Sequence, residues 1–290
     1  MTQVVADLVA LLDVEALSPN VFRGRNTGEP RPRVFGGQVA GQALMAAGRT
    51  VAGLPAHSLH AYFLRPGNTT SPIDYEVERI RDGKSFVTRV VTATQGGEAI
   101  FHMSASFHAA EPGFSHQRSM PPTPAPEDCI TWAQWLEPLV QRLPPEVATY
   151  FLRDRAIEIR PVDPMDMNAR DQAGMQQRFW IRLASPIGDD PLVHQAIALY
   201  ASDHTLLSVA MRPHGRTFFS RDLMAASVDH AMWLHQSFRV DQWLLFEQDS
   251  PASFGGLGLG LGHLFTQQGV LVATVAQEGL IRRVDRPGSA

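Results

Sequence analysis

The sequence predicts an α+β fold made of two tandem repeats, each a buried helix followed by antiparallel strands. Prolines 121, 122, 124 and 126 divide the chain near its middle, since proline removes backbone donors and disfavours helix before it. The same order of elements occurs on both sides of this break. We expect an N-terminal repeat over 1–114, a Pro-rich linker with a helix over 115–150 and a C-terminal repeat over 151–290 that carries the site.

The first repeat begins its pattern with an Ala/Gly-rich helix over 34–51, opened by a glycine pair. Strands are expected over 57–67 and 87–94, because these segments alternate or run apolar. A glycine pair at 96–97 then predicts a turn before a final strand over 98–109.

The second repeat has a helix over 191–210 that is apolar nearly all round. Such a helix belongs inside a sheet rather than on the surface. Strands are expected over 227–238 and within 263–279. The segment His60–Leu64 matches His230–Leu234, and a second match aligns Ser106 with Gln277. A helix held in a curled antiparallel sheet is the hot-dog arrangement, so the pattern predicts a double hot-dog.

Composition excludes several classes of function. The formal net charge is −4 and no basic run is present, so a nucleic-acid partner is not expected. Cys129 is the only cysteine, which excludes an internal disulfide and a multi-cysteine zinc site. Residues 1–17 suggest an amphipathic helix rather than a signal peptide, and apolar runs are too short to span a bilayer. We therefore expect a cytoplasmic protein with no membrane partner.

Asp203 is the most informative residue, because it lies late in a buried-looking helix whose counterpart has no acid over 35–53. A buried carboxylate is costly unless it is paired or hydrogen-bonded, and perturbed carboxylates cluster at functional sites. The residues alone leave two interpretations open: a solvent-facing helix end or a catalytic group. Ser227 and Gln277 can orient a water, although each is also typical of an ordinary surface or capping position.

The sequence shows no cofactor or metal motif. The glycine-rich segment 254–263 lacks the G-x-G-x-x-G spacing and predicts a strand with leucines on one face. Its glycine face would let another backbone or a ligand approach closely. No G-x-S-x-G nucleophile motif and no H-E-x-x-H metal spacing occur.

The motifs, taken in order, resemble those of the acyl-CoA thioesterase II family over almost the whole chain: VFGGQVAGQAL, HSLHAYFLRPG, RDGKSF, YASD, SVDHAMWLH and VATVAQEG. This resemblance implies a double hot-dog fold and hydrolysis of fatty acyl-CoA to free acid and CoA, without a cofactor. It also implies that Asp203, Ser227 and Gln277 hold the attacking water. Relatives often carry threonine where Ser227 stands and bulkier residues in the glycine-rich segment.

Two alternative functions stay open at this level. A hot-dog scaffold could bind acyl-CoA without hydrolysing it, because a fold does not determine a function. An enoyl-CoA hydratase would require a paired Asp/His motif, which the sequence lacks. Exposed sheet edges commonly pair between subunits, so a homo-oligomer is expected.

Overall fold

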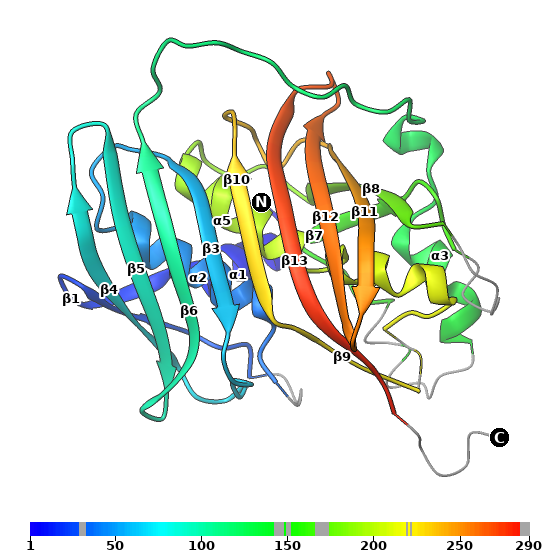
Figure 1. Ribbon diagram of the computed structural model, residues 1–290, viewed down its shortest axis with the longest axis horizontal. Coiled ribbons are helices and arrows are strands. Elements are labelled where there is room, and N and C mark those ends of the chain that lie inside the picture. The colour runs from blue at the N-terminus through cyan, green and yellow to red at the C-terminus, as the bar shows by residue number, and fades with distance from the viewer. Residues whose placement is uncertain are drawn as a thin grey trace.

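The protein is a double hot-dog: one large antiparallel sheet curves around a central helix layer (Figure 1). The computed structural model describes residues 1–28, 33–141, 148, 152–165, 174–218, 220 and 222–284. The proposed domain boundaries near residues 114 and 150 stay a prediction, and the second of them falls in a stretch only partly within these ranges.

The elements of the two halves follow the same plan. The N-terminal half contains α1 (Gln3–Leu12), β1 (Val14–Ser18), β2 (Val21–Gly24), α2 (Gly36–Gly48), β3 (Ala56–Phe63), β4 (Ile73–Asp82), β5 (Phe86–Gln95) and β6 (Glu98–His108). The C-terminal half contains η1 (Pro126–Asp128), α3 (Trp132–Val140), β7 (Ile157–Pro161), β8 (Gln176–Leu183), α5 (Pro191–Ser202), η2 (Leu206–Ala210), η3 (Arg212–His214), β9 (Leu223–Ser227), β10 (Asp229–Leu234), β11 (Leu244–Phe254), β12 (Leu257–Thr266) and β13 (Leu271–Arg283).

The two halves share one sheet because β3 and β10 pair antiparallel at its centre. The strand order is β1-β2-β4-β5-β6-β3-β10-β13-β12-β11-β8-β7, with β9 also paired to β13. Asp229 lies opposite Tyr62 and Trp233 opposite Ser58. Figure 1 shows this junction in the middle of the sheet, with α2 and α5 behind it. The halves are therefore related by an approximate two-fold rotation.

Helices α2 and α5 pack side by side and antiparallel through glycines. A Cβ at Gly37 would lie 2.6 Å from the Tyr200 carbonyl oxygen, and one at Gly41 would lie 3.2 Å from that of Ala196. Only glycine allows such close approach of two helix backbones. This packing brings the last turn of α5 against the first turn of α2.

The predicted register between the repeats is wrong by one residue in each strand. The sequence match aligned Ala61 with Ala231. In the structure, Ala61 pairs with Met103, and the corresponding buried pair in the second repeat is Met232 with Val275. A slip of one residue moves a strand's side chains to the opposite face of the sheet, so similarity between apolar strands cannot set register.

The predicted helix over 191–210 is shorter than expected, because α5 ends at Ser202 and η2 follows. Helix η2 packs against the glycine face of β12. A Cβ at Gly260 would lie 2.8 Å from the Leu206 carbonyl oxygen, and one at Gly258 would lie 2.8 Å from Ala210. The close approach predicted for these glycines is therefore made by η2, through its backbone at Gly260 and through the Ala210 side chain at Gly258.

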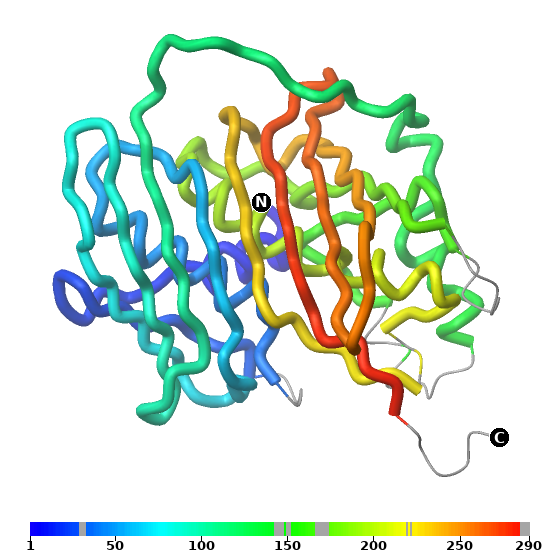
Figure 2. The backbone as a smooth tube through the Cα atoms, viewed as in Figure 1, coloured from blue at the N-terminus to red at the C-terminus, as the bar shows by residue number. Residues whose placement is uncertain are grey.

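The proline-rich segment after β6 crosses over one end of the sheet before α3, as the green tube in Figure 2 shows. It is held in place by side chains of β8. The Trp180 indole donates to the Pro124 carbonyl at 2.9 Å, and Arg178 donates to that of Pro122 at 2.7 Å. Prolines keep their carbonyl acceptors, so the segment can be bound without strand pairing.

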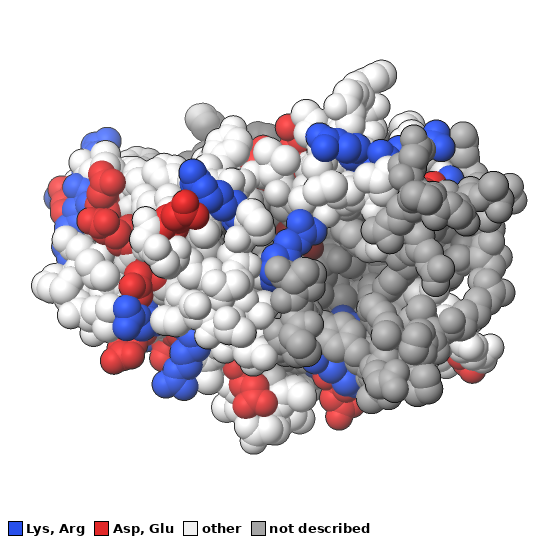
Figure 3. Space-filling model, turned by 90° about the horizontal axis from the view of Figure 1, so that it is seen from below, with Lys and Arg blue, Asp and Glu red and all other residues white. Residues whose placement is uncertain are grey.

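Charged side chains are interspersed on the face shown in Figure 3, where Lys and Arg lie next to Asp and Glu. Such mixing does not form the basic track that grips a phosphate backbone. Among the helices of the described ranges, none is long and apolar enough to cross a membrane.

Candidate active site

Asp203 caps the C-terminal end of α5 and faces the N-terminal end of α2. Its Oδ2 accepts a hydrogen bond of 2.7 Å from the backbone N–H of Gly37. The first N–H groups of a helix lack intrahelical partners and carry a partial positive charge. Because the two helices run antiparallel, the first turn of α2 supplies a donor to the carboxylate at the end of α5.

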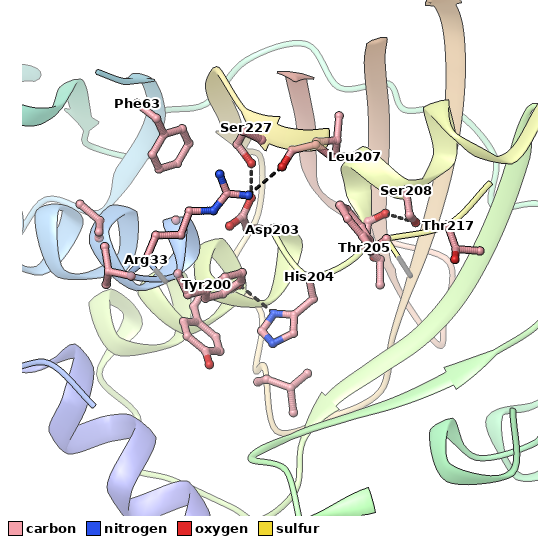
Figure 4. A pocket seen from close by; sticks show the side chains of 18 of the residues that line it. Arg33, Phe63, Tyr200, Asp203, His204, Thr205, Leu207, Ser208, Thr217 and Ser227 are labelled. Atoms are coloured by element: carbon pink, nitrogen blue, oxygen red, sulfur yellow. Dashed lines mark hydrogen bonds between the residues drawn. The ribbon is translucent and has the colours of Figure 1, made fainter. Parts of the chain in front are cut away.

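Ser227 and Gln277 complete a polar cluster around Asp203. Gln277 Nε2 donates to Asp203 Oδ1 at 2.6 Å, and the Ser227 hydroxyl donates to the same oxygen at 3.3 Å. Gln277 Nε2 is also 3.0 Å from Ser227 Oγ. The structure thus brings together all three residues predicted from the sequence, from the end of α5, β9 and β13. Figure 4 shows Asp203 and Ser227 side by side.

The environment makes Asp203 more basic than an ordinary carboxylate. Burial raises the pKa of Asp203 to about 6, against the lowering effects of its hydrogen bonds from Gln277, Gly37 and Ser227. The charge of Arg33, whose guanidinium lies beside the carboxylate in Figure 4, also lowers it. A carboxylate with a pKa near neutrality can accept a proton during a reaction and release it afterwards.

The side-chain carbonyl oxygen of Gln277 is an unused hydrogen-bond acceptor. The side chain is fully buried, and its Oε1 has no hydrogen-bond partner among the residues that the structure describes. Buried polar atoms normally find a partner, so an unpaired carbonyl beside a carboxylate and a hydroxyl is suited to a water or substrate donor.

The last turn of α5 is held against β10 by a neutral histidine. Ser202 Oγ lies 2.9 Å from His230 Nε2 and donates to the Leu199 carbonyl at 2.9 Å. Burial lowers the pKa of His230 to about 4, so the ring is uncharged at neutral pH. His230 therefore acts as a structural residue that holds the end of α5.

A buried amide network holds the chain just after Asp203. Gln248 Nε2 donates to Thr205 Oγ1 at 2.7 Å, and its Oε1 accepts from Gln177 Nε2 at 2.6 Å. Gln177 also donates to Ser208 Oγ at 2.8 Å. Satisfied buried networks rigidify their surroundings, so this one fixes the turn in which Asp203 lies.

The cluster opens onto a cavity of about 1080 Å³ between the repeats. Asp203 and Ser227 line its wall. Figure 4 shows Phe63 on one side of them and Thr205 and Ser208 on the other. The volume exceeds that of a pocket for a small polar molecule and suits an extended ligand.

The other end of the helix pair has no such cluster. Thr50, just after α2, accepts from the buried Arg89 at 2.7 Å. In the corrected register the counterpart of Gln277 is Ala105, rather than Ser106 as the sequence match predicted. An apolar side chain and a buried cation cannot hold a water beside a carboxylate, so the site exists once.

Within the described residues, no group of three or more His, Cys, Asp or Glu side chains could hold a metal ion. His204 follows Asp203 in sequence, but Figure 4 shows its ring directed away from the carboxylate. Its Nδ1 lies 3.2 Å from the Tyr200 carbonyl. The two residues therefore do not form an Asp/His pair of the hydratase kind.

Known proteins match this chain over almost its whole length. Residues 26–108 match the family "Acyl-CoA thioesterase N-terminal domain" and residues 147–280 match "Acyl-CoA thioesterase". Human acyl-coenzyme A thioesterase 8 is 41% identical over 95% of this chain and 88% of its own length. The chain belongs to the acyl-CoA thioesterase II family.

Other members of the acyl-CoA thioesterase II family support the same assignment. Acyl-CoA thioesterase 2 of Haemophilus influenzae is 36% identical, covering 97% of this chain and 99% of its own. The crystal structure of TesB2 from Mycobacterium marinum, an acyl-CoA thioesterase II, has a TM-score of 0.79 and 42% identity over 96% of this chain and 99% of its own. The protein is thus an acyl-CoA thioesterase, which favours the enzyme over the non-catalytic binding module.

Sequence reasoning missed two partners of Asp203 in this thioesterase. The glycine pair at 36–37 was recognised as a helix start but not as a hydrogen-bond donor to the other repeat. Arg33, which donates to the Ala225 carbonyl at 2.7 Å, gave no signal. Both contacts join segments more than 160 residues apart, and only the pairing of the repeats places them together.

Proposed function

We propose that Asp203 is the general base of thioester hydrolysis and that Ser227 and Gln277 hold the attacking water. The observation that carries this proposal is the convergence of Gln277 Nε2 and Ser227 Oγ on Asp203 Oδ1 at the cavity wall. A carboxylate with a raised pKa, a hydroxyl oxygen and an unpaired amide oxygen together offer acceptors for both hydrogens of a water.

In this mechanism the water oxygen attacks the thioester carbonyl carbon while Asp203 takes its proton. The tetrahedral intermediate then collapses, the C–S bond breaks, and the electron pair leaves with sulfur. A thiol has a reference pKa of about 8.5, so the thiolate leaves without obligatory protonation. The proton on Asp203 passes to the thiolate or to solvent, which restores the base.

The rate should depend on pH through Asp203. The base must be charged to accept a proton, and the pKa of Asp203 is raised to about 6. We therefore expect kcat/KM to rise from pH 4.5, reach half its maximum near pH 6 and level off above pH 7. Release of free thiol from an acyl-CoA, followed between pH 4.5 and 8, measures this profile. A rate independent of pH over this range would contradict the proposal.

We further propose that the enzyme self-associates. The sheet ends in β1 and β7, which are paired on one side only within the chain. Such edges commonly pair between subunits. Sedimentation velocity at micromolar protein is expected to give a dimer or larger species, and a monomer across the whole concentration range would exclude this.

We also propose a cytoplasmic location. The N-terminal helix α1 places Val5, Leu8 and Leu12 in the hydrophobic core. A segment that contributes core side chains is unsuited to be a removable targeting peptide, since its removal would expose apolar surface.

A further inference from the structure

The cavity wall is strongly positive. Among the described residues that line it, Asp203 is the one carboxylate, whereas six residues are arginines: Arg33, Arg65, Arg153, Arg155, Arg212 and Arg216. Guanidinium groups match phosphate and carboxylate oxygens with two parallel hydrogen bonds. A cavity with this charge balance is suited to an anionic ligand.

Several of these arginines already have partners in the protein. Arg216 forms an ion pair with Asp222 at 3.0 Å. Arg65 donates to the Ala99 carbonyl at 2.8 Å. These contacts satisfy part of each guanidinium and hold the side chains to the wall.

Arg212 differs from them. Its Nε is buried and has no hydrogen-bond partner. Arg212 forms no ion pair with a carboxylate in the described part of the chain, although it lies along the same cavity. The nearby charge of Asp163 acts on Arg212, but that carboxylate is already paired with Arg178. A half-buried cation without an ion-pair partner of its own is costly, and a guanidinium cannot avoid the cost by losing its proton. Such a group is stabilised when a ligand anion enters the cavity.

The chemistry of the substrate indicates which anion this is. The acyl chain of a fatty acyl-CoA carries no charge, whereas the CoA portion carries phosphates. Apolar side chains line the cavity from both repeats, with Phe63, Ile100 and Phe101 from the N-terminal repeat and Trp135, Phe179 and Leu207 from the C-terminal half, so the cavity suits an acyl chain. The wall that contains Arg212 also contains the polar side chains of Gln177 and Ser208.

We propose that Arg212 binds a phosphate group of CoA, so that the CoA portion extends along the cavity towards Arg212. This inference rests on the proposed function, because it takes the thioester to lie at Asp203. It adds a residue for recognition of the leaving group that the Asp203 cluster does not provide.

The test compares two thioesters with the same acyl group, one on CoA and one on pantetheine, which lacks the phosphates. Arg212→Gln is expected to lower kcat/KM for the acyl-CoA about tenfold to a hundredfold, since hydrogen bonds to charged groups contribute about 1.5–3 kcal/mol. The acyl-pantetheine should be hydrolysed equally by both proteins. Arg212→Lys keeps the charge but cannot donate two parallel hydrogen bonds, so it should recover part of the loss.

Arg79→Gln is the matched control, because Arg79 lies outside the cavity and donates to Asn20 on the surface. It should leave both substrates unaffected. An equal loss with both thioesters, or no loss with either, would overturn the role of Arg212. A loss confined to acyl chains that end in a carboxylate would also overturn it and would assign the anion to the acyl group. Failure of the wild type to hydrolyse either thioester would instead contradict the proposed function.

Discussion

Asp203→Asn is expected to lower kcat about 10²–10⁴-fold, the range typical for loss of a general base. Asparagine has the same shape but cannot take a proton from water. Its Oδ1 can still accept from the Gly37 N–H, and its Nδ2 can donate to the unpaired Oε1 of Gln277 after that amide turns over. The variant should therefore fold and bind substrate while losing the chemical step.

The stability of this variant gives an independent check. Because the pKa of Asp203 is raised to about 6, the folded protein binds a proton more readily than the unfolded chain. Stability of the wild type should therefore fall as pH rises through about 4 to 6 and stay low above it. Asp203→Asn removes this loss, so it should melt at a higher temperature than the wild type at pH 7.5.

Activity and thermal unfolding can be measured on the same samples. Asp74→Asn is a suitable control, since Asp74 pairs with Arg23 on the surface, far in the chain from the site. It should change neither quantity greatly. Wild-type rates in Asp203→Asn, measured by thiol release with several acyl-CoA substrates, would remove Asp203 from the mechanism.

Gly37→Ala is expected to show the second-largest effect, on both stability and activity. The added Cβ would lie 2.6 Å from the Tyr200 carbonyl oxygen, a backbone atom that cannot move without separating α2 from α5. Overpacking of this kind costs about 1–3 kcal/mol. A displacement of about 1 Å between Asp203 and its donor can cost about 10²-fold in rate.

Gly113→Ala is the matched control, because no atom lies within 4 Å of a Cβ at that position. Circular dichroism melting and thiol release measure the two effects. If Gly37→Ala retained both wild-type stability and wild-type rate, the close helix contact would not be needed to position Asp203.

Several features of the site were predictable because they depend on local sequence. The apolar helix predicted over 191–210 contains a lone acid, and a catalytic carboxylate was one of the two interpretations that the sequence left open. The structure places that acid in a buried position at the end of α5. The resemblance to a family added Ser227 and Gln277, which lie within hydrogen-bond distance of that acid. The positions of Ser227 and Gln277 in the sequence, far from Asp203, do not by themselves indicate that the three side chains meet.

Other features were not predictable from local pattern. The Gly37 N–H lies beside Asp203 because the helices run antiparallel. The register between repeats was misassigned because apolar strands look alike when shifted by one residue, although the shift exchanges their faces. The unpaired Nε of Arg212 depends on what surrounds it, and a single arginine in a sequence does not reveal that.

The sequence by itself determined that two helices would be buried and that one of them would carry a lone carboxylate, because burial follows from the apolar content of each segment. Only the tertiary structure decided what that carboxylate would touch. Hydrogen bonds act over about 3 Å, and the atoms that meet Asp203 come from segments that the chain separates but the shared sheet and the glycine contact bring together.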